Sequence, residues 1–240
     1  MGGAGKYVYC IMEDGPLADM GDSAIYTIPY RDLAAVVRDT PLPPPAPTRD
    51  HLVGHLRVIE QVMAVKTVIP AGFGTIATTE TEVRDRLLAA RYDELHAALA
   101  YLEGKIELGV RALWRDLPSV FSEIAAEHER IRALREWIAA RPTAHTHQQR
   151  IELGRMVAEA LAQKKASEGA EILDALAPLA AQVRTGPLVG DRMVLNAAFL
   201  VERQREPNFD QCIARLGEQQ ADRLFFRYVG PAPPFNFVDL

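Results

Sequence analysis

A long helical stretch enclosed by two strand-like segments constrains the fold of this 240-residue chain more than any other feature. Residues 105–114 alternate between polar and apolar side chains, and residues 193–201 form a strongly apolar run, so both are predicted strands. Between them, apolar residues recur at helical spacing over 119–140 and again over 148–176. The chain therefore has to insert a long helical segment between two strands of one domain.

The other elements of the C-terminal half predict the class of that domain. Asn208 is expected to cap a helix, residues 224–229 are the last predicted strand, and residues 183–189 are the expected hairpin partner of the apolar strand. The order of strand, helix, strand, strand, helix and strand predicts a ferredoxin-like domain over 104–230. Its helical insertion is expected to cover about 119–182.

The first hundred residues predict a second, smaller α+β domain over 1–103. Its expected strands are 7–12, 24–29, 34–38 and 67–70, and its expected helices are 49–66 and 80–102. Thr48 or Asp50 is expected to cap the first helix, and Thr79 with Glu82 forms a capping box for the second. The predicted apolar stripes are Leu52, Leu56, Ile59 and Met63 on the first helix, and Val83, Leu87, Leu95, Leu99 and Leu102 on the second.

Two proline-rich segments predict extended backbone, because proline fixes φ and cannot donate a backbone hydrogen bond. Residues 41–47 contain five prolines and are expected to form a stiff surface connection. Residues 231–240 are expected to form an extended tail that packs across the two domains, with binding to a partner protein as the alternative. The residues predicted to dock this tail or to bind a partner are Pro231, Pro233, Pro234, Phe235, Phe237 and Val238.

The segment Gly72-Phe73-Gly74-Thr75 is predicted to be a tight turn in which Gly72 and Gly74 are structural residues. It lacks the spacing and the lysine of a phosphate-binding loop. We therefore expect positive φ angles at this turn and no bound phosphate.

Charge and hydropathy disfavour several classes of protein. The chain carries 32 acidic and 27 basic residues, a net charge of −5, which opposes binding to nucleic acid. No window approaches 18 uninterrupted apolar residues, and Met1–Lys6 lack the apolar core of a signal peptide. We expect a cytoplasmic protein that does not enter a membrane, with Cys10 and Cys212 as buried free thiols.

No group of residues has the spacing expected of a catalytic, cofactor or metal site. His51 and His55 lie four residues apart on a predicted helix, a spacing that can hold a metal, but no third ligand is near them in sequence. We interpret both as surface histidines. Nucleophile motifs of hydrolases and kinase signatures are absent from the sequence, so no catalytic residue and no cofactor are predicted, and we do not expect an enzyme.

Three segments together resemble the GvpF/GvpL family of gas vesicle proteins. They are residues 59–75, which contain Ile-Glu-Gln-Val and Thr-Val-Ile-Pro-Ala-Gly-Phe-Gly-Thr, residues 195–201 (Leu-Asn-Ala-Ala-Phe-Leu-Val), and residues 228–238 (Tyr-Val-Gly-Pro-Ala-Pro-Pro-Phe-Asn-Phe-Val). The last segment is the most specific. The chain departs from the family pattern at Ala71 and Gly72, where a bulkier and a basic residue are common, and at Ala232 and Phe235.

The resemblance implies a minor structural or accessory protein of gas vesicle assembly, associated with the vesicle in the cytoplasm. Its implied partners are the small shell protein of the GvpA type and other accessory gas vesicle proteins. The helical region 119–177 is either a solvated surface or the part that contacts the shell protein. The alternative function is a small-ligand-sensing α+β regulatory module, since ferredoxin-like sheets often bind metabolites.

Overall fold

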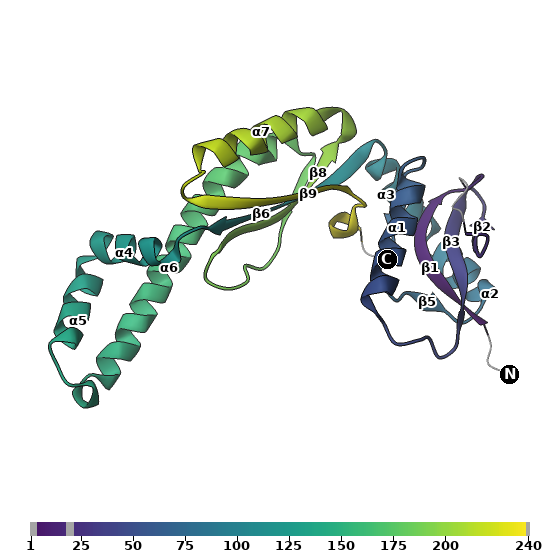
Figure 1. Cartoon of the computed structure of the whole chain (residues 1–240). Coiled ribbons are helices and arrows are strands. Elements are labelled where there is room, and N and C mark those ends of the chain that lie inside the picture. Colours follow the sequence, from purple (N-terminus) through teal and green to yellow (C-terminus); the bar gives the residue numbers. More distant parts are fainter. Residues whose placement is uncertain (1–3, 18–21, 239–240) are drawn as a thin grey trace. The chain divides into compact units, whose positions relative to one another are not determined.

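The computed structural model describes residues 4–17 and 22–238 and divides the chain into two compact units (Figure 1). The first unit consists of Met1–Leu108, Leu200–Gln204 and Gly230–Leu240, and the second of Gly109–Phe199 and Arg205–Val229. Helices accompany two antiparallel sheets, which confirms the predicted α+β class. The prediction that Met1–Lys6 do not form a signal peptide falls partly on residues 1–3, which lie outside the described residues.

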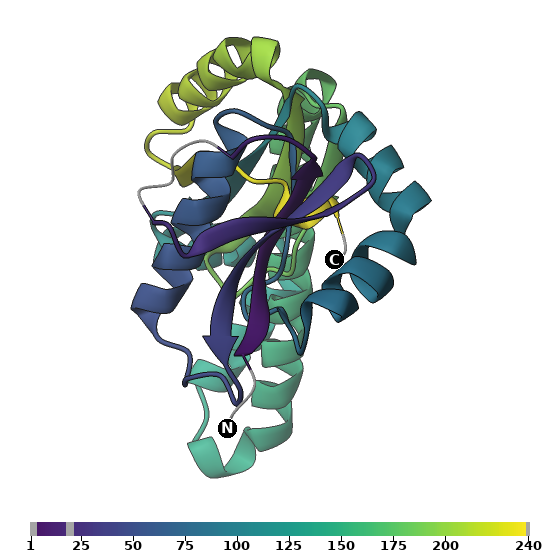
Figure 2. The ribbon, with the colours of Figure 1, turned by 90° about the vertical axis from the view of Figure 1, so that its right-hand side faces the viewer.

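The sheet of the first unit has the strand order β2-β3-β1-β4, and β5 also pairs with β1. Its strands are β1 (Ala4–Glu13), β2 (Ile25–Tyr30), β3 (Leu33–Pro41), β4 (Val68–Pro70) and β5 (Ile76–Ala77). Residues 8–12 and 33–37 are continuously buried, which indicates that both faces of the sheet are covered. In Figure 2, α1 (Arg49–Met63) lies on one side of these strands, and α2 (Glu80–Glu82) and α3 (Tyr92–Leu102) lie on the other.

Helix α1 begins where the sequence predicts, because the Oγ1 atom of Thr48 accepts a hydrogen bond from the backbone N of His51 at 3.2 Å. Its buried face is different from the predicted stripe. The buried residues are His55, Val58, Ile59 and Val62, whereas Leu52 is 41% exposed. The prediction of a surface position for His55 is therefore wrong, and the core-facing stripe passes through that histidine.

The predicted helix over 80–102 is interrupted. It divides into α2 (Glu80–Glu82), a π-helical segment η1 (Val83–Ala89) and α3 (Tyr92–Leu102). The wider π turn lengthens the repeat, so that the core residue after Val83 is Leu88 rather than Leu87. Thr79 caps the start as predicted, through a 3.1 Å hydrogen bond from the backbone N of Glu82.

The second sheet has the strand order β7-β8-β6-β9. Its strands are β6 (Lys105–Trp114), β7 (Gln182–Thr185), β8 (Met193–Glu202) and β9 (Leu224–Ala232). With α6 (His147–Leu176) between β6 and β7 and α7 (Glu206–Gln219) between β8 and β9, the elements follow the order β-α-β-β-α-β. This element order, with this order of strands, occurs in ferredoxin-like domains.

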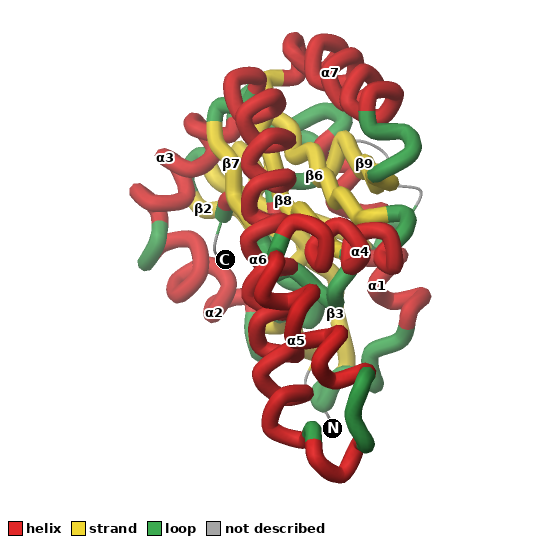
Figure 3. Tube along the Cα trace, turned by 90° about the vertical axis from the view of Figure 1, so that its left-hand side faces the viewer, coloured by secondary structure: helices red, strands yellow, loops and turns green. Residues whose placement is uncertain are grey.

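Helices α6 and α7 cover one face of this sheet (Figures 1 and 3). Trp114 of β6, Phe199 of β8 and Phe209 of α7 are fully buried, and the Phe199 and Phe209 rings lie 5.1 Å apart. Gly169 of α6 lies so close to the sheet that a Cβ atom there would be 3.0 Å from the carbonyl oxygen of Val194. The free thiols of Cys10 and Cys212 are buried, as predicted.

The helical insert contains three helices instead of the two predicted ones. They are α4 (Leu117–Glu127), α5 (Glu129–Ala139) and α6, with short 3₁₀ turns η2 at Thr143–His145 and η3 at Ala177–Leu179. His128 separates α4 from α5 with extended backbone angles, φ −115° and ψ 97°, and is exposed. The prediction of one continuous helix over 119–140 is therefore wrong at His128.

Two predictions near the C-terminus are also wrong. Helix α7 follows the 3₁₀ turn η4 (Arg203–Arg205) and begins at Glu206 with Pro207 in its first turn, so Asn208 lies inside the helix instead of capping it. The C-terminal segment begins extended, since β9 continues to Ala232, but it is not extended throughout, because a 3₁₀ turn η5 forms at Phe235–Phe237. Residues 42–48 connect β3 to α1 without regular secondary structure and most of them are exposed, whereas Pro41 of the predicted connection 41–47 is the last residue of β3. None of the helices in the described residues is long and apolar enough to cross a bilayer.

Candidate functional site

The C-terminal residues predicted to dock belong to the first unit. Pro233, Pro234 and Phe237 are buried, Phe235 and Val238 are partly buried, and Pro231 is exposed. Gly230 allows the segment to enter this position, because its φ is +145° and a Cβ atom would lie 2.9 Å from the carbonyl oxygen of Glu107. Whether the segment also links the two units or binds a partner stays a prediction.

An aromatic cluster in the first unit receives Phe235. His55 of α1 is its centre, with ring centroids 5.6 Å from Tyr7, 5.7 Å from Tyr9, 5.6 Å from Phe73 and 6.4 Å from Phe235. Phe235 also packs against the apolar core formed by β1, β3, β4 and α1. The C-terminal segment therefore completes a core whose other members come from the first 75 residues.

A chain of hydrogen bonds fixes the tautomer of His55. Its Nε2 atom lies 3.0 Å from the carbonyl oxygen of Ala71, which can only accept, so Nε2 donates. Its Nδ1 atom then accepts from the hydroxyl of Tyr7 at 2.9 Å, and that hydroxyl accepts from the backbone N of Gly74 at 3.2 Å. Burial lowers the pKa of His55, which favours this neutral form.

The same bonds hold the predicted turn at 71–75. Gly74 has a φ of +90°, as expected for a turn glycine, whereas Gly72 is outside the left-handed region. The expectation of positive φ therefore holds for Gly74 and not for Gly72. Thr75 closes the turn by donating from its hydroxyl to the carbonyl oxygen of Gly72 at 2.8 Å.

Glu107 is a buried carboxylate that anchors the C-terminal segment. Its Oε2 atom accepts from the backbone N of Asn236 at 2.9 Å, and its Oε1 atom accepts from the side-chain amide of Asn236 at 2.6 Å. The sequence places Glu107 on the polar face of β6, but the residue is only 7% exposed. Burial raises the pKa of Glu107, and the two hydrogen bonds from Asn236 oppose that rise.

Two variants of Glu107 should separate its charge from its hydrogen bonds. Glu107→Ala leaves the donors of Asn236 without acceptors and should lower the free energy of unfolding by about 1–3 kcal/mol. Glu107→Gln keeps an acceptor and removes the buried charge, so its loss should be smaller.

The pH dependence of stability follows from the raised pKa. The unfolded chain ionises Glu107 first, so wild type should lose stability relative to Glu107→Gln as pH rises from about 4 towards 7. Urea unfolding of both proteins across this range measures the difference. A difference that does not change with pH would contradict a raised pKa at this carboxylate.

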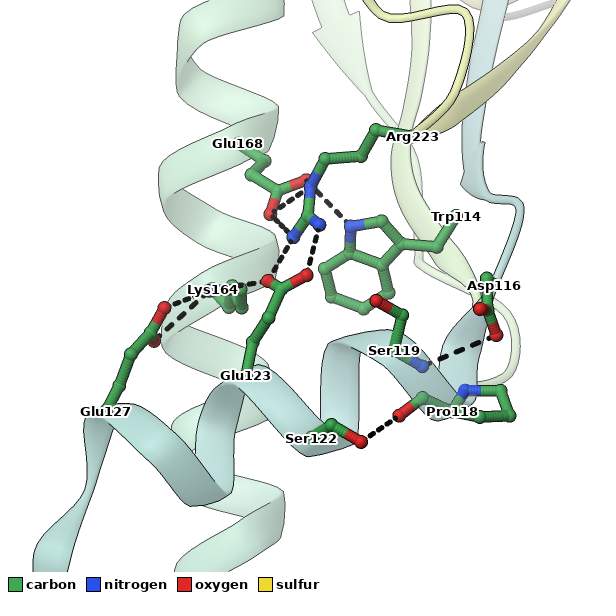
Figure 4. Close-up of polar contacts among 10 residues, drawn as sticks. All are labelled: Trp114, Asp116, Pro118, Ser119, Ser122, Glu123, Glu127, Lys164, Glu168 and Arg223. Atoms are coloured by element: carbon green, nitrogen blue, oxygen red, sulfur yellow. Dashed lines mark hydrogen bonds and ion pairs between the residues drawn. The ribbon is translucent and has the colours of Figure 1, made fainter.

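A second polar cluster, around Arg223, joins the helical insert to the sheet within the second unit (Figure 4). The guanidinium donates to both carboxylate oxygens of Glu123 on α4, at 2.8 and 3.0 Å, and reaches Glu168 on α6 at 2.6 Å. The indole nitrogen of Trp114 donates to Glu168 at 2.7 Å. The bonds from Arg223 lower the pKa of Glu123, and both carboxylates raise the pKa of Arg223.

Lys164 extends this cluster between α4 and α6. Its ammonium group lies 3.2 Å from Glu123 and 2.8 Å from Glu127, and its side chain is 16% exposed. The sequence suggests that the charged residues near 127 and 164 form outward, solvated faces. For Lys164 that interpretation is wrong, since its charge holds two helices together.

The burial of side chains on helix α6 differs between its two halves. The half that packs on the sheet contains its buried residues, which are Ala160, Leu161, Gly169, Ile172 and Leu176. In the half before it, from His147 to Glu159, Ile151 is 62% exposed and Leu153, Met156 and Val157 are only partly buried. We call α5 together with this half of α6 the helical arm (Figure 1).

Possible metal ligands do not gather in the described part of the chain, where no three His, Cys, Asp or Glu residues are placed to share an ion. Both ring nitrogens of His55 have protein partners. His51, four residues earlier, is exposed as predicted.

Sequence comparisons place residues 5–239 in the family described as gas vesicle synthesis protein GvpL/GvpF. Gas vesicle protein F of a Streptomyces species is 34% identical over 86% of this chain and 84% of its own length. Gas vesicle protein F of Haloferax mediterranei is 29% identical over 92% of this chain and 84% of its own length.

Solved structures show the same fold. The crystal structure of GvpF from Anabaena has a TM-score of 0.85 at 24% identity and covers 99% of both chains. GvpF from Microcystis aeruginosa has a TM-score of 0.82 at 22% identity, covering 98% of this chain and 99% of that one. Together with the match along nearly the whole sequence, these findings mean that the chain belongs to the GvpL/GvpF family of gas vesicle proteins.

Proposed function

We propose that this protein binds the gas vesicle shell protein, together with other gas vesicle proteins, during assembly, and that it does so without catalysing a reaction. Family membership supports a role connected with gas vesicles. In this proposal the protein works in the cytoplasm, by presenting a shaped surface to other polypeptides.

The observation that carries the proposal is a group of exposed and partly buried apolar side chains on the helical arm. Ile151, Leu153, Met156 and Val157 lie within seven residues of α6, and none of them is buried. Trp137 on α5 is 37% exposed as well. Apolar side chains that a pair of helices leaves in contact with water are suited to bind an amphipathic segment of another protein.

A shell subunit is the partner that fits this surface. Subunits of a wall that encloses gas have an apolar side, which is open to water until the wall closes around it. A helical arm that covers this side would keep the subunit from aggregating before it joins the wall. The arm is fixed at its base by the cluster around Arg223, so it can present the surface in a defined direction.

Site-specific photo-cross-linking tests the proposal. A photoreactive amino acid at Ile151, which is 62% exposed, should cross-link to the shell protein when both are produced together. The matched control is the same amino acid at Val65 in the first unit, which is 61% exposed. Cross-links from Val65 and none from Ile151 would place the interface on the first unit and contradict a role for the helical arm.

A further inference from the structure

The face of the second sheet opposite α6 and α7 carries an exposed group of arginines. Side chains alternate along a strand, so Arg111, Leu113 and Arg115 point away from the face on which Trp114 is buried. Arg111 contacts Asn196 of β8 at 3.2 Å, and Arg115 lies over the ring of Phe225 in β9 at 5.6 Å. Leu113, Arg115, Arg192, Phe225 and Arg227 line a hollow of about 400 Å³. We call these five residues and Arg111 the arginine face.

The charge of this face is opposite to that of the chain as a whole, which is −5. All four arginines are exposed. Within residues 4–17 and 22–238, none of the four pairs with a carboxylate. Two aspartates are next to them in sequence. Asp116 uses its carboxylate to cap α4 at the backbone N of Ser119, and Asp191 is exposed.

Backbone carbonyl groups hold two of the guanidinium groups in place. Arg192 donates from Nε to the carbonyl oxygen of Trp114 and from Nη2 to that of Arg115, both at 2.9 Å. Arg115 donates from Nε to the carbonyl oxygen of Leu224 at 3.1 Å. A guanidinium has five N–H donors, so each side chain is oriented and still has donors for a ligand. Such fixed donors suit carboxylates, which they can bind through two parallel hydrogen bonds.

We propose that the arginine face binds an acidic amphipathic segment of a partner protein. Carboxylates of that segment would pair with the guanidinium groups, and an apolar side chain would enter the hollow beside Leu113 and Phe225. The apolar lining favours a polypeptide over a nucleic acid, whose phosphates the net negative charge of the chain also repels. This interface is separate from the helical arm and does not depend on binding of the shell protein.

A labelled peptide can test the proposal with the full chain. The probe is a 12-residue peptide that alternates Glu and Leu, and its binding is followed by fluorescence anisotropy at low and high salt. Wild type should bind it, more weakly at high salt, and Arg227→Glu should weaken binding at least about tenfold. The side chain of Arg227 is exposed and forms no hydrogen bond or ion pair with another described residue, so this change should leave the melting temperature unchanged.

The control variant is Arg57→Glu, which changes the net charge equally at an exposed position on α1. It should bind the peptide as wild type does. The proposal is wrong if wild type does not bind the peptide at low salt, or if both variants weaken binding equally. Tighter binding of a labelled oligothymidylate than of the peptide would identify the face as a nucleic-acid site instead.

Discussion

Replacing Phe237 with alanine is expected to destabilise the first unit by about 3–5 kcal/mol, the usual cost of removing a buried phenylalanine side chain. The side chain is 7% exposed, and the turn that contains it also places Phe235 against His55 and Asn236 against Glu107. Loss of its packing should loosen this whole segment. Deleting residues 231–240 should have a larger effect, because both anchors are then lost.

The measurement has to report on the first unit alone. Both tryptophans, Trp114 and Trp137, belong to the second unit, so their fluorescence does not follow the first. Hydrogen exchange of the β1 backbone amides reports on the first unit, and Phe237→Ala should increase the rate of this exchange. The control is Phe225→Ala, which removes the same atoms from a side chain that is 43% exposed. If both variants changed exchange in β1 equally, the packing of Phe237 would not explain the effect.

Replacing Arg223 with alanine is expected to lower the free energy of unfolding of the second unit by about 2–3 kcal/mol. Two carboxylates, Glu123 and Glu168, then face each other without their shared cation. The side chains of all three residues are 17–33% exposed, so solvent reduces the loss below that of a fully buried pair. Arg223→Lys should lose less than alanine, although an ammonium group cannot bind two carboxylates through parallel hydrogen bonds.

Tryptophan fluorescence during urea unfolding measures this change, because Trp114 is part of the cluster. The control is Arg155→Ala, which breaks a surface ion pair with Glu159 on α6 and should cost less than about 0.5 kcal/mol. The lowered pKa of Glu123 gives a second test. Its stabilising effect is present at neutral pH and disappears as pH falls through that pKa, so the difference between wild type and Arg223→Ala should shrink in acid. An unchanged difference would contradict the role of Arg223.

Periodic patterns in the sequence predicted the secondary structure well where one face of an element meets a core. The alternation over 105–114 matches β6 at both ends, and the second helical run matches α6 to within one residue. The predicted helices 80–102 and 119–140 are each interrupted in the structure, and the interruptions have local causes that the spacing of apolar residues does not predict. One extra residue in the π turn shifts the stripe of the second helix, and His128 divides a run that looks continuous.

The polar anchors could not be predicted in the same way. Asn236 is 129 residues from Glu107, and Arg223 is 100 residues from Glu123, so no local pattern relates the partners. His55 is a different case. Its spacing from Val58, Ile59 and Val62 is that of a helical core face, and this signal was available in the sequence. What the sequence does not reveal is how a histidine is accommodated there, because its hydrogen-bond partners, Tyr7 and Ala71, are distant in the chain.

The discontinuous make-up of the first unit has a consequence for synthesis of the protein on the ribosome. Residues 4–108 are made early, but Asn236 and Phe235, which satisfy Glu107 and cover His55, are made only after the second unit. During translation the first unit therefore stays incomplete until the second unit has been made. A nascent chain that stalls before residue 230 leaves the first unit without Phe235 and Phe237, so this unit becomes stable only once that segment has been made.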